Sequence, residues 1–269
     1  MTLFDVIDKA AKMGFEGIEF IDLQKDLPQS ERLALATQLR ARAEEKGLPI
    51  VAYTVGAKLW KPPFLLGREI RRVMREVDVA VALGAPLMRH DLVWALTKHG
   101  RGKSFYTMMP RLAKAVRKIT AYAAERGVKT CSENHGQVAQ DSDRMEAFVK
   151  LVNHPNYGLL VDMGNFLCVD EEPRSAVTRV APYVIHAHAK DMLCCAPDTD
   201  GGKGIIKTRG GNGLKPTAVG EGSVPVSQCI AALRAAGYDG WLSLEYEGKE
   251  DCLAAIPRGL ANLRSYLEK

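Results

Sequence analysis

Short apolar runs alternate with amphipathic stretches along the whole chain, and this alternation limits the possible folds more than any other feature of the sequence. Strands that are each followed by a helix are typical of a parallel sheet covered by helices. The expected strands are residues 17–20, 49–54, 86–90, 128–134, 158–162, 184–190 and 241–246. The expected helices are residues 3–13, 31–46, 68–83, 108–126, 142–152, 173–181, 226–236 and 253–267. The pattern therefore predicts an α/β fold.

Glycine stands at the end of five of the expected helices. A helix often ends on a residue with left-handed backbone, which glycine adopts without steric cost. The five residues are Gly14, Gly47, Gly84, Gly127 and Gly237. We expect each of them to have a positive φ.

The length and the count of elements predict an incomplete barrel. A (β/α)8 barrel needs roughly 250 residues, and this chain has 269. The chain begins on a helix and has seven expected strands, whereas an eight-stranded barrel should begin on a strand. We therefore predict one domain, residues 1–269, with a TIM (β/α)8-type barrel that lacks its first β-strand at the N-terminus. A neighbouring chain or the C-terminal strand should cover the exposed edge of residues 17–20, because unpaired strand edges promote association.

Four side chains with metal-ligating atoms stand at the ends of four expected strands. They are Glu133, Asp162, His188 and Glu245. Polar groups at the C-terminal ends of successive parallel strands meet where α/β barrels carry out their chemistry. Three carboxylates and one imidazole predict one divalent ion, with Mn²⁺ favoured and Mg²⁺, Co²⁺ or Zn²⁺ as alternatives. A strand-end salt bridge is the alternative for the glutamates, and a core histidine is the alternative for His188.

Composition excludes several classes of function. No run of about 18 apolar residues exists to span a membrane, and the N-terminus lacks the basic start and apolar core of a signal peptide. The net charge of +5 is spread over helices that also carry acidic residues, so it gives little support to nucleic-acid binding. The six cysteines have no CxxC spacing and are expected to be reduced. We expect a cytoplasmic protein that binds neither a membrane nor nucleic acid.

Two connections, residues 91–107 and 192–222, are too long for plain βα loops. Both follow the C-terminal ends of strands, where long loops form lids or substrate walls. The second connection is rich in glycine, which predicts mobility, and it carries Arg209 and two lysines. Arg209 is therefore a candidate for substrate binding, with a solvated flexible loop as the alternative.

Several motifs of the chain resemble those of the xylose isomerase-like TIM barrels, a superfamily that includes sugar and sugar-phosphate isomerases and epimerases. No single motif is specific, but their order and their placement at strand ends are specific for the superfamily. The motifs are Gly-Phe-Glu-Gly-Ile-Glu at 14–19, Glu-Asn-His at 133–135, Asp-Met-Gly-Asn at 162–165, His-Ala-His-Ala-Lys-Asp at 186–191, Gly-Glu-Gly at 220–222 and Ser-Leu-Glu-Tyr at 243–246.

The resemblance implies one divalent-metal site on Glu133, Asp162, His188 and Glu245. In the ketose 3-epimerases of the superfamily, the two glutamates are also the acid/base pair on opposite faces of the substrate. That role would fall on Glu133 and Glu245. Those epimerases carry a substrate-contacting histidine three residues after the aspartate, whereas this chain has Asn165. Asn165 is therefore a candidate substrate contact and a departure from the epimerase pattern.

The expected chemistry is removal of a proton from a carbon next to a carbonyl. A metal chelated by the carbonyl and the adjacent hydroxyl stabilises an enediolate, and a carboxylate removes the proton. We expect a metal-dependent sugar or sugar-phosphate isomerase or epimerase in which His186, Lys190 and His90 contact the substrate. An ion pair of Lys190 with Asp191 and a structural role for His90 are equally open. Tyr53 is a candidate wall for a sugar ring, although core packing is the commoner use of such residues.

Three other functions compete with this one. The first is a dehydratase of the inosose or dehydroshikimate type, in which loss of water follows the same proton abstraction, and Asn165 keeps it open. The second is an AP endonuclease, which would need about three zinc ions and for which six histidines are few. The third is a non-catalytic sugar-binding barrel, which metal content would separate from the enzymes. A homo-oligomer is expected, because barrels of this superfamily often pair through helices and loops.

Overall fold

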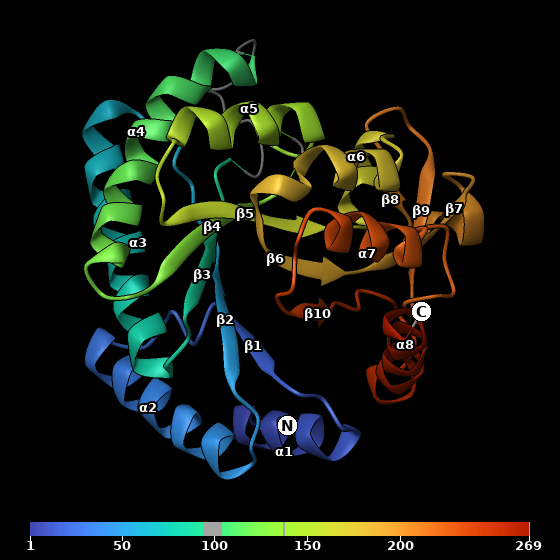
Figure 1. The fold of residues 1–269 in the computed structure, drawn as a ribbon, viewed down its shortest axis with the longest axis horizontal. Helices are drawn as coiled ribbons and strands as arrows, with labels where there is room; N and C mark the ends of the chain where they lie inside the picture. Colours follow the sequence, from blue (N-terminus) through green and yellow to red (C-terminus); the bar gives the residue numbers. More distant parts are fainter. Residues whose placement is uncertain (94–103, 137, 269) are drawn as a thin grey trace. The chain divides into compact units, whose positions relative to one another are not determined.

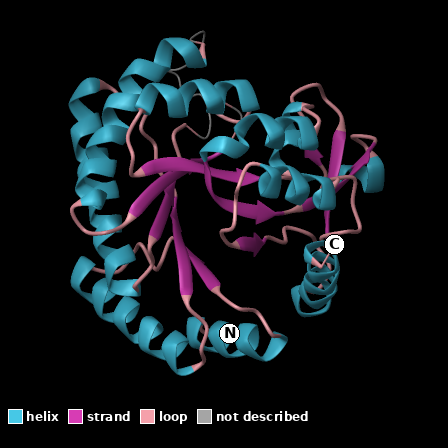
Figure 2. Ribbon diagram, in the orientation of Figure 1, coloured by secondary structure: helices cyan, strands magenta, loops and turns pink. Residues whose placement is uncertain are grey.

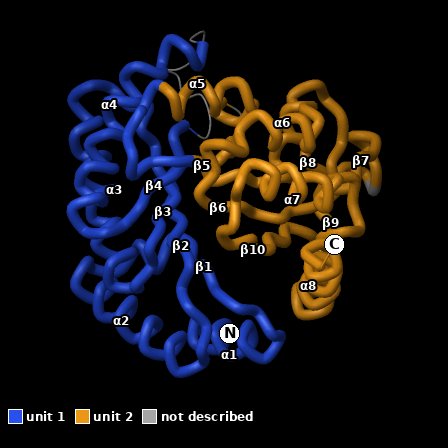
Figure 3. Tube along the Cα trace, viewed as in Figure 1, with its two compact units in different colours: residues 1–93, 97–132, 151–158 blue, residues 94–96, 133–150, 159–269 orange. Residues whose placement is uncertain are grey.

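The structure is a computed structural model that describes residues 1–93, 104–136 and 138–268. The chain falls into two compact units, which Figure 3 colours separately. Unit 1 consists of residues 1–93, 97–132 and 151–158. Unit 2 consists of residues 94–96, 133–150 and 159–269.

Unit 1 is built on parallel strands that pair in chain order. The strands are β1 (Ile18–Ile21), β2 (Ile50–Val55), β3 (Leu87–His90) and β4 (Lys129–Glu133), and the last residue of β4 belongs to unit 2. The helices are α1 (Leu3–Met13), α2 (Gln29–Glu45), α3 (Pro63–Leu83) and α4 (Phe105–Ala124). Figure 1 shows α2, α3 and α4 along one side of these strands. Every residue of β2 is buried, as expected for an apolar strand with a parallel neighbour on each side.

Unit 2 contains three parallel strands with β6 between the other two. They are β5 (Tyr157–Asp162), whose first two residues belong to unit 1, β6 (Val184–Ala189) and β10 (Leu242–Leu244). The helices are α5 (Ser142–Val152), α6 (Pro173–Val180), α7 (Val226–Ala235) and α8 (Cys252–Leu267), with 3-10 turns η1 (Asn165–Val169), η2 (Ala181–Tyr183) and η3 (Thr199–Gly202). The register pairs Asp162 with His188 and His188 with Ser243. Figure 2 shows the alternation of strands and helices.

Left-handed backbone ends the predicted helices as expected. The φ values are 85° at Gly14, 64° at Gly47, 72° at Gly84, 70° at Gly127 and 85° at Gly237. A β-carbon is disfavoured in this region of φ. The prediction from the five glycines is confirmed.

Two helices begin three or more residues earlier than predicted, because the residues that start them lie upstream of the apolar pattern. The helix α3 begins at Pro63 rather than at residue 68, with proline in the first turn, where its missing N–H costs nothing. The helix α4 begins at Phe105 rather than at residue 108, and Oγ of Ser104 accepts a hydrogen bond from the N–H of Thr107 at 3.3 Å.

The described residues contain four parallel strands in unit 1 and three in unit 2, and the chain begins on α1. The prediction of fewer than eight barrel strands is confirmed for the described residues, and the identity of the missing strand stays a prediction. The strand β1 pairs with β2, with Phe20 opposite Tyr53. The covering of its other edge stays a prediction.

The second long connection contains a small antiparallel sheet rather than only a solvated loop. Its strands are β7 (Asp191–Cys195), β8 (Ile206–Lys207) and β9 (Gly213–Thr217), and β9 pairs with both of the others. The glycines supply the turns between these strands, which is why their density suggested a mobile segment. Of the first long connection, residues 94–103 lie outside the described residues.

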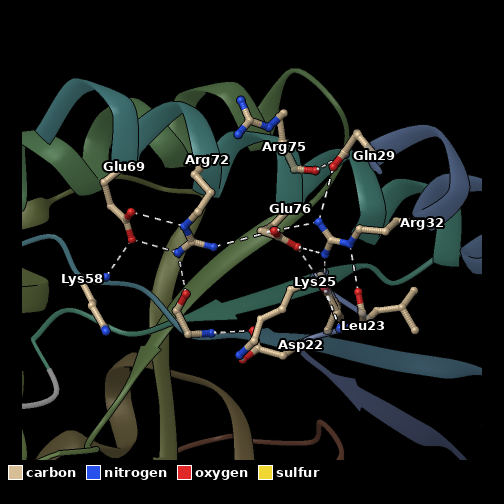
Figure 4. Close-up of polar contacts among 12 residues, drawn as sticks. Asp22, Leu23, Lys25, Gln29, Arg32, Lys58, Glu69, Arg72, Arg75 and Glu76 are labelled. Carbon is tan, nitrogen blue, oxygen red and sulfur yellow. Dashed lines mark hydrogen bonds and ion pairs between the residues drawn. The ribbon is translucent and has the colours of Figure 1, made fainter. Parts of the chain in front are cut away.

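A buried charge network joins α2 and α3 in unit 1 (Figure 4). Arg32 donates two hydrogen bonds to the carboxylate of Glu76, at 3.0 and 2.5 Å. The hydroxyl of Tyr53 donates to Oε2 of Glu76 at 2.9 Å. Tyr53 is 0% exposed, and burial raises the pKa of its hydroxyl. Tyr53 is therefore a core residue, which is the commoner alternative considered for it, and not a wall for a sugar ring.

Candidate functional site

Four side chains from the ends of strands converge in unit 2. Glu133 ends β4, Asp162 ends β5, His188 lies on β6 and Glu245 directly follows β10. One ligand atom from each side chain lies within 4.8 Å of the corresponding atoms of the other three. Paired strands run about 4.8 Å apart, so the register that sets Asp162 opposite His188 brings their side chains together.

Asp162 offers one buried oxygen to this cluster. Its Oδ1 accepts the N–H of Asn165 at 2.8 Å. Its Oδ2 accepts no hydrogen bond from the described residues and lies 3.3 Å from Nζ of Lys190. Burial raises the pKa of Asp162 to about 7, with Lys190 opposing the rise and Glu245 and Glu133 adding to it. The ammonium of Lys190 is thus the cation that faces this buried carboxylate oxygen.

The backbone of Asp162 is held by Asn134, a residue that the sequence analysis did not single out as functional. The side-chain amide of Asn134 donates to the carbonyl of Asp162 at 2.9 Å and accepts its N–H at 2.8 Å. The side-chain amide of Asn134 thus makes the two hydrogen bonds that the backbone of a paired strand would make with Asp162. Its position directly after Glu133 was the only signal in the sequence.

Glu133 is supported by Asn165. The Nδ2 atom of Asn165 donates to Oε1 of Glu133 at 2.7 Å. Asn165 is 4% exposed and Glu133 is 6% exposed. The structure therefore brings the predicted substrate contact Asn165 together with the cluster, as a partner of Glu133.

Glu245 and Lys190 form the charged centre of the cluster. The Oε2 atom of Glu245 lies 3.3 Å from Nδ1 of His188 and 3.3 Å from Nζ of Lys190. Burial acts to raise the pKa of Glu245, but His188 and Lys190 hold that pKa well below its usual range.

Lys190 is buried among carboxylates. Its side chain is 3% exposed, and Nζ lies 3.6 Å from Glu247 in addition to its contacts with Asp162 and Glu245. Burial acts to lower the pKa of Lys190, and the surrounding carboxylates raise it well above its usual value. Glu247 was missed as a contact, although it ends the same sequence run as Glu245.

His186 faces the same way as His188. The two ring centroids are 5.4 Å apart, as alternation along a strand predicts. His186 is 1% exposed, and its Nε2 lies 3.1 Å from Oγ of Ser243. It therefore lies beside the cluster and contacts the neighbouring strand β10.

Asp191 is occupied by backbone N–H groups. Its carboxylate accepts those of Met192, Gly220, Gly222 and Val224 at 2.8 to 3.0 Å. These contacts fasten residues 220–224 to the start of β7. Asp191 thus has a structural role in place of the ion pair with Lys190 that the sequence left open.

Two predicted substrate contacts have partners elsewhere. Arg209 forms a bidentate ion pair with Asp141, with Nη2 3.0 Å from Oδ2. His90 belongs to unit 1 and is 0% exposed. Its Nδ1 lies 3.2 Å from the carbonyl of Asp91, and burial lowers its pKa to about 4.

The residues present fit a divalent cation. Three carboxylates and one imidazole are a mixed oxygen and nitrogen donor set. The buried Oδ2 of Asp162 accepts no hydrogen bond from the described residues and lies 3.3 Å from the ammonium of Lys190, so it is an oxygen that a metal ion could share with that lysine.

Comparison with known families places the chain among related barrels. The sequence profile described as xylose isomerase-like TIM barrel matches residues 7–266. An inosose dehydratase of Lacticaseibacillus casei is 24% identical over 138 residues, which are 51% of this chain and 46% of that protein. The chain spans about half the length of the curated relatives that it matches.

Solved structures share the fold. A D-psicose 3-epimerase of Clostridium cellulolyticum H10 with D-tagatose has a TM-score of 0.77 at 17% identity, covering 99% of this chain and 94% of that one. A xylose isomerase-like TIM barrel protein of Mycobacterium smegmatis in complex with magnesium has a TM-score of 0.75 at 19% identity, covering 98% and 87%. The α/β barrel class predicted from the sequence is confirmed. Within the part of the chain that the structure describes, no helix is both long and apolar enough to cross a membrane.

Proposed function

Since this chain belongs to the xylose isomerase-like TIM barrel family, we propose that it is a divalent-metal-dependent isomerase or epimerase acting on a sugar, a sugar phosphate or a related keto-polyol. The observation that carries the proposal is the convergence of Glu133, Asp162, His188 and Glu245 within 4.8 Å. The similar proteins include an epimerase and a dehydratase, which supports an enzymatic function.

The four converging residues would hold the ion, with Mn²⁺ as the favoured metal. When bound, the ion supplies Lewis-acid stabilisation of the negative charge that develops on the substrate oxygen. Ligand distances of roughly 2.0 to 2.3 Å are expected.

Glu245 is proposed as the carboxylate that removes a proton from the substrate, because it is the more accessible of the two glutamates. Its side chain is 27% exposed, whereas Glu133 is buried and hydrogen-bonded to Asn165. A general base must come within hydrogen-bond reach of the proton that it takes. Glu133 is proposed as the second acid/base group, on the opposite face of the substrate.

The same cluster provides groups for substrate hydroxyls or charges. Lys190 offers ammonium protons beside Glu245, and His186 lies against its neighbour His188. Arg209 would first have to leave Asp141. His90, which is 0% exposed in unit 1, keeps its substrate role as a prediction only.

A second candidate is a dehydratase, and one observation favours it. Asn165 Nδ2 holds Oε1 of the buried Glu133 at 2.7 Å, which leaves Glu245, with a side chain 27% exposed, as the more accessible of the two glutamates. Inversion at carbon needs groups on both faces of the substrate, whereas elimination of water can proceed from one face. The curated relative, an inosose dehydratase, is consistent with such a reaction.

The test is a substrate screen in D₂O with the metal-loaded protein. Mn²⁺-loaded and EDTA-treated protein would be incubated with ketoses, their phosphates and cyclic keto-polyols. Mass spectrometry and NMR would detect isomerised product, and absorbance of a conjugated enone would detect loss of water. We expect deuterium at the carbon next to the carbonyl in the Mn²⁺-loaded sample only. Product without deuterium would favour a hydride shift or shielded internal return of the proton.

A metal-replete crystal measured with anomalous scattering would test the site itself. Density between the four proposed ligands is expected. An ion bound only elsewhere, for example by the cysteines, would rule out the assignment.

The quaternary state and the location also stay predictions. We propose a homo-oligomer, for which light scattering on the purified protein is the direct measurement. The cytoplasmic location predicted from the sequence would be tested by fractionating cells of the source organism.

A further inference from the structure

Two amide side chains support Glu133 from inside unit 2. Asn165 Nδ2 donates to Oε1 of Glu133 at 2.7 Å. Gln140 Nε2 donates to the backbone oxygen of Asn165 at 2.8 Å. Both amide residues are 4% exposed. Hydrogen bonds to an ionised acceptor are strong when water is excluded, so this chain of contacts restrains Glu133 firmly.

Asn165 also contacts a second member of the cluster. Its backbone N–H donates to Oδ1 of Asp162 at 2.8 Å, at the start of η1. One residue thus holds one oxygen of Glu133 with its side chain and one oxygen of Asp162 with its backbone. Rotation of either carboxylate would break a buried hydrogen bond and leave a polar group without its partner.

We propose that Asn165 is a positioning residue that sets the orientation of Glu133 and Asp162 toward a shared divalent ion, with Gln140 as its support. The inference rests on the metal site of the proposed function and deepens it. A planar carboxylate that is fixed at one oxygen has a fixed plane, so Asn165 defines where the two acidic ligands point. Asn165 thus holds one oxygen of Glu133, which is proposed above both as a ligand and as an acid/base group.

The test uses metal binding alone and needs no substrate. Asn165→Leu keeps the branched shape but removes the donor, and Gln140→Leu removes only the support. The matched control is Asn156→Leu in unit 1, where Nδ2 donates to the carbonyl of Val128 at 2.7 Å. Isothermal titration with Mn²⁺ gives the affinity, and the visible spectrum of the Co²⁺-loaded protein reports the ligand geometry.

Asn165→Leu is expected to weaken Mn²⁺ binding by roughly 10- to 100-fold, the usual effect of removing a partner of a metal ligand, and to change the Co²⁺ spectrum at saturation. Gln140→Leu should show a smaller change in the same direction, and it serves as the measurement if Asn165→Leu does not fold. Asn156→Leu should lower the melting temperature without altering the spectrum, and it should change affinity by no more than about twofold.

The outcomes separate this inference from the proposed function. Failure of the unmodified protein to bind Mn²⁺ would overturn the metal site and the inference together. Unchanged affinity and spectrum in both Asn165→Leu and Gln140→Leu would overturn the positioning role while leaving the site intact. An equal loss of Mn²⁺ affinity in Asn156→Leu would show that the effect comes from general destabilisation, and it would also overturn the positioning role of Asn165.

Discussion

A lysine ammonium is buried in unit 2 because three carboxylates surround it. Lys190 Nζ lies 3.3 Å from Asp162 and from Glu245, and 3.6 Å from Glu247. The first two contacts involve residues that are also proposed to ligate the ion. Lys190 and the ion would therefore compete electrostatically for the same carboxylates.

Replacing Lys190 with Met should strengthen Mn²⁺ binding and lower the stability of the metal-free protein. Removing a positive charge beside a divalent ion removes a repulsion, so Mn²⁺ affinity should rise by about tenfold or more. In EDTA, the variant has neither the lysine nor the metal ion beside the buried Asp162, so its free energy of unfolding should fall. Titration calorimetry and thermal unfolding measure the two effects.

The control is Lys150→Met. Lys150 pairs with Glu146 at 2.7 Å but is 57% exposed, so its loss should change neither quantity appreciably. A fall in Mn²⁺ affinity on substituting Lys190 would show that the ammonium supports metal binding and would contradict the competition.

Substitution of the two glutamates tests the proton transfer. Glu245→Gln should lower turnover of a substrate found in the screen by about 10²-fold or more, the scale of general acid/base catalysis. Glu133→Gln should have a comparable effect, part of it through weaker metal binding, so metal content must be measured in each variant. Glu221→Gln, which alters an exposed partner of Arg258, is the control. Full turnover in both metal-loaded variants would refute the two-glutamate mechanism.

Among the elements, the segment of residues 220–224 is fastened to β7 by the carboxylate of Asp191 and by the N–H of Ser223, which donates to the carbonyl of Met192 at 2.9 Å. The carboxylate of Asp191 accepts the backbone N–H groups of Gly220, Gly222 and Val224 in this segment, and that of Met192 beside it. A β-carbon added at Gly222 would lie 2.1 Å from Oδ1 of Asp191. Only glycine permits this approach, because the contacting carboxylate is itself held by those four bonds.

Gly222→Ala should therefore destabilise the protein by about 1 to 3 kcal/mol, the range for overpacking a tight site. Urea unfolding measures the change in the free energy of unfolding. Gly67→Ala is the control, because Gly67 lies within α3 and its added β-carbon would be 3.6 Å from a flexible Arg71. That variant should be neutral or more stable by roughly 0.5 to 1 kcal/mol. Equal stability of the two variants would contradict the packing argument.

The helices α2 and α3 are joined by the buried pair of Arg32 and Glu76, with side chains 6% and 5% exposed. Arg32→Met should cost about 3 to 5 kcal/mol in the free energy of unfolding, because the buried Glu76 would lose its bidentate partner and keep the hydroxyl of Tyr53 and Nη1 of Arg72 at 3.7 Å. Arg40→Met removes a pair with Glu44 that is half exposed, and it should cost less than about 1 kcal/mol. A small effect at Arg32 in urea unfolding would show that water or another group compensates Glu76.

At the scale of the whole molecule, the proposed ion would act through unit 2, which contains all four candidate ligands. The sequence predicts that residues 1–269 form one domain. Ligand at 100 times its dissociation constant stabilises a two-state protein by about 2.7 kcal/mol. Scanning calorimetry with Mn²⁺ should therefore show one transition that moves up as a whole by several degrees, and EDTA should reverse the shift. Two transitions, of which only one responds to Mn²⁺, would contradict a single cooperative domain.

Much of the fold was predictable from the sequence because its signals are local. The period of the apolar residues marks strands and helices, and a left-handed residue such as Gly84 ends a helix through its own backbone. The first residues of the helices were harder to predict. The cap of α4, Ser104, lies before the apolar pattern begins, so the pattern alone does not mark it. The convergence of Glu133, Asp162, His188 and Glu245 was also predictable, because ends of parallel strands meet wherever the chain folds as a barrel.

Tertiary structure alone decided which groups contact one another across long stretches of chain. Asn165 and Glu133 are 32 positions apart, and Lys190 and Glu245 are 55 positions apart. No local spacing relates such residues; the strand register and the path of each turn bring them together. By itself, the sequence determined the elements, the count of barrel strands below eight and the candidate ligands. Only the tertiary structure showed that Asn165 holds Glu133, because a hydrogen bond forms only when the donor and acceptor distance is right to within a few tenths of an ångström.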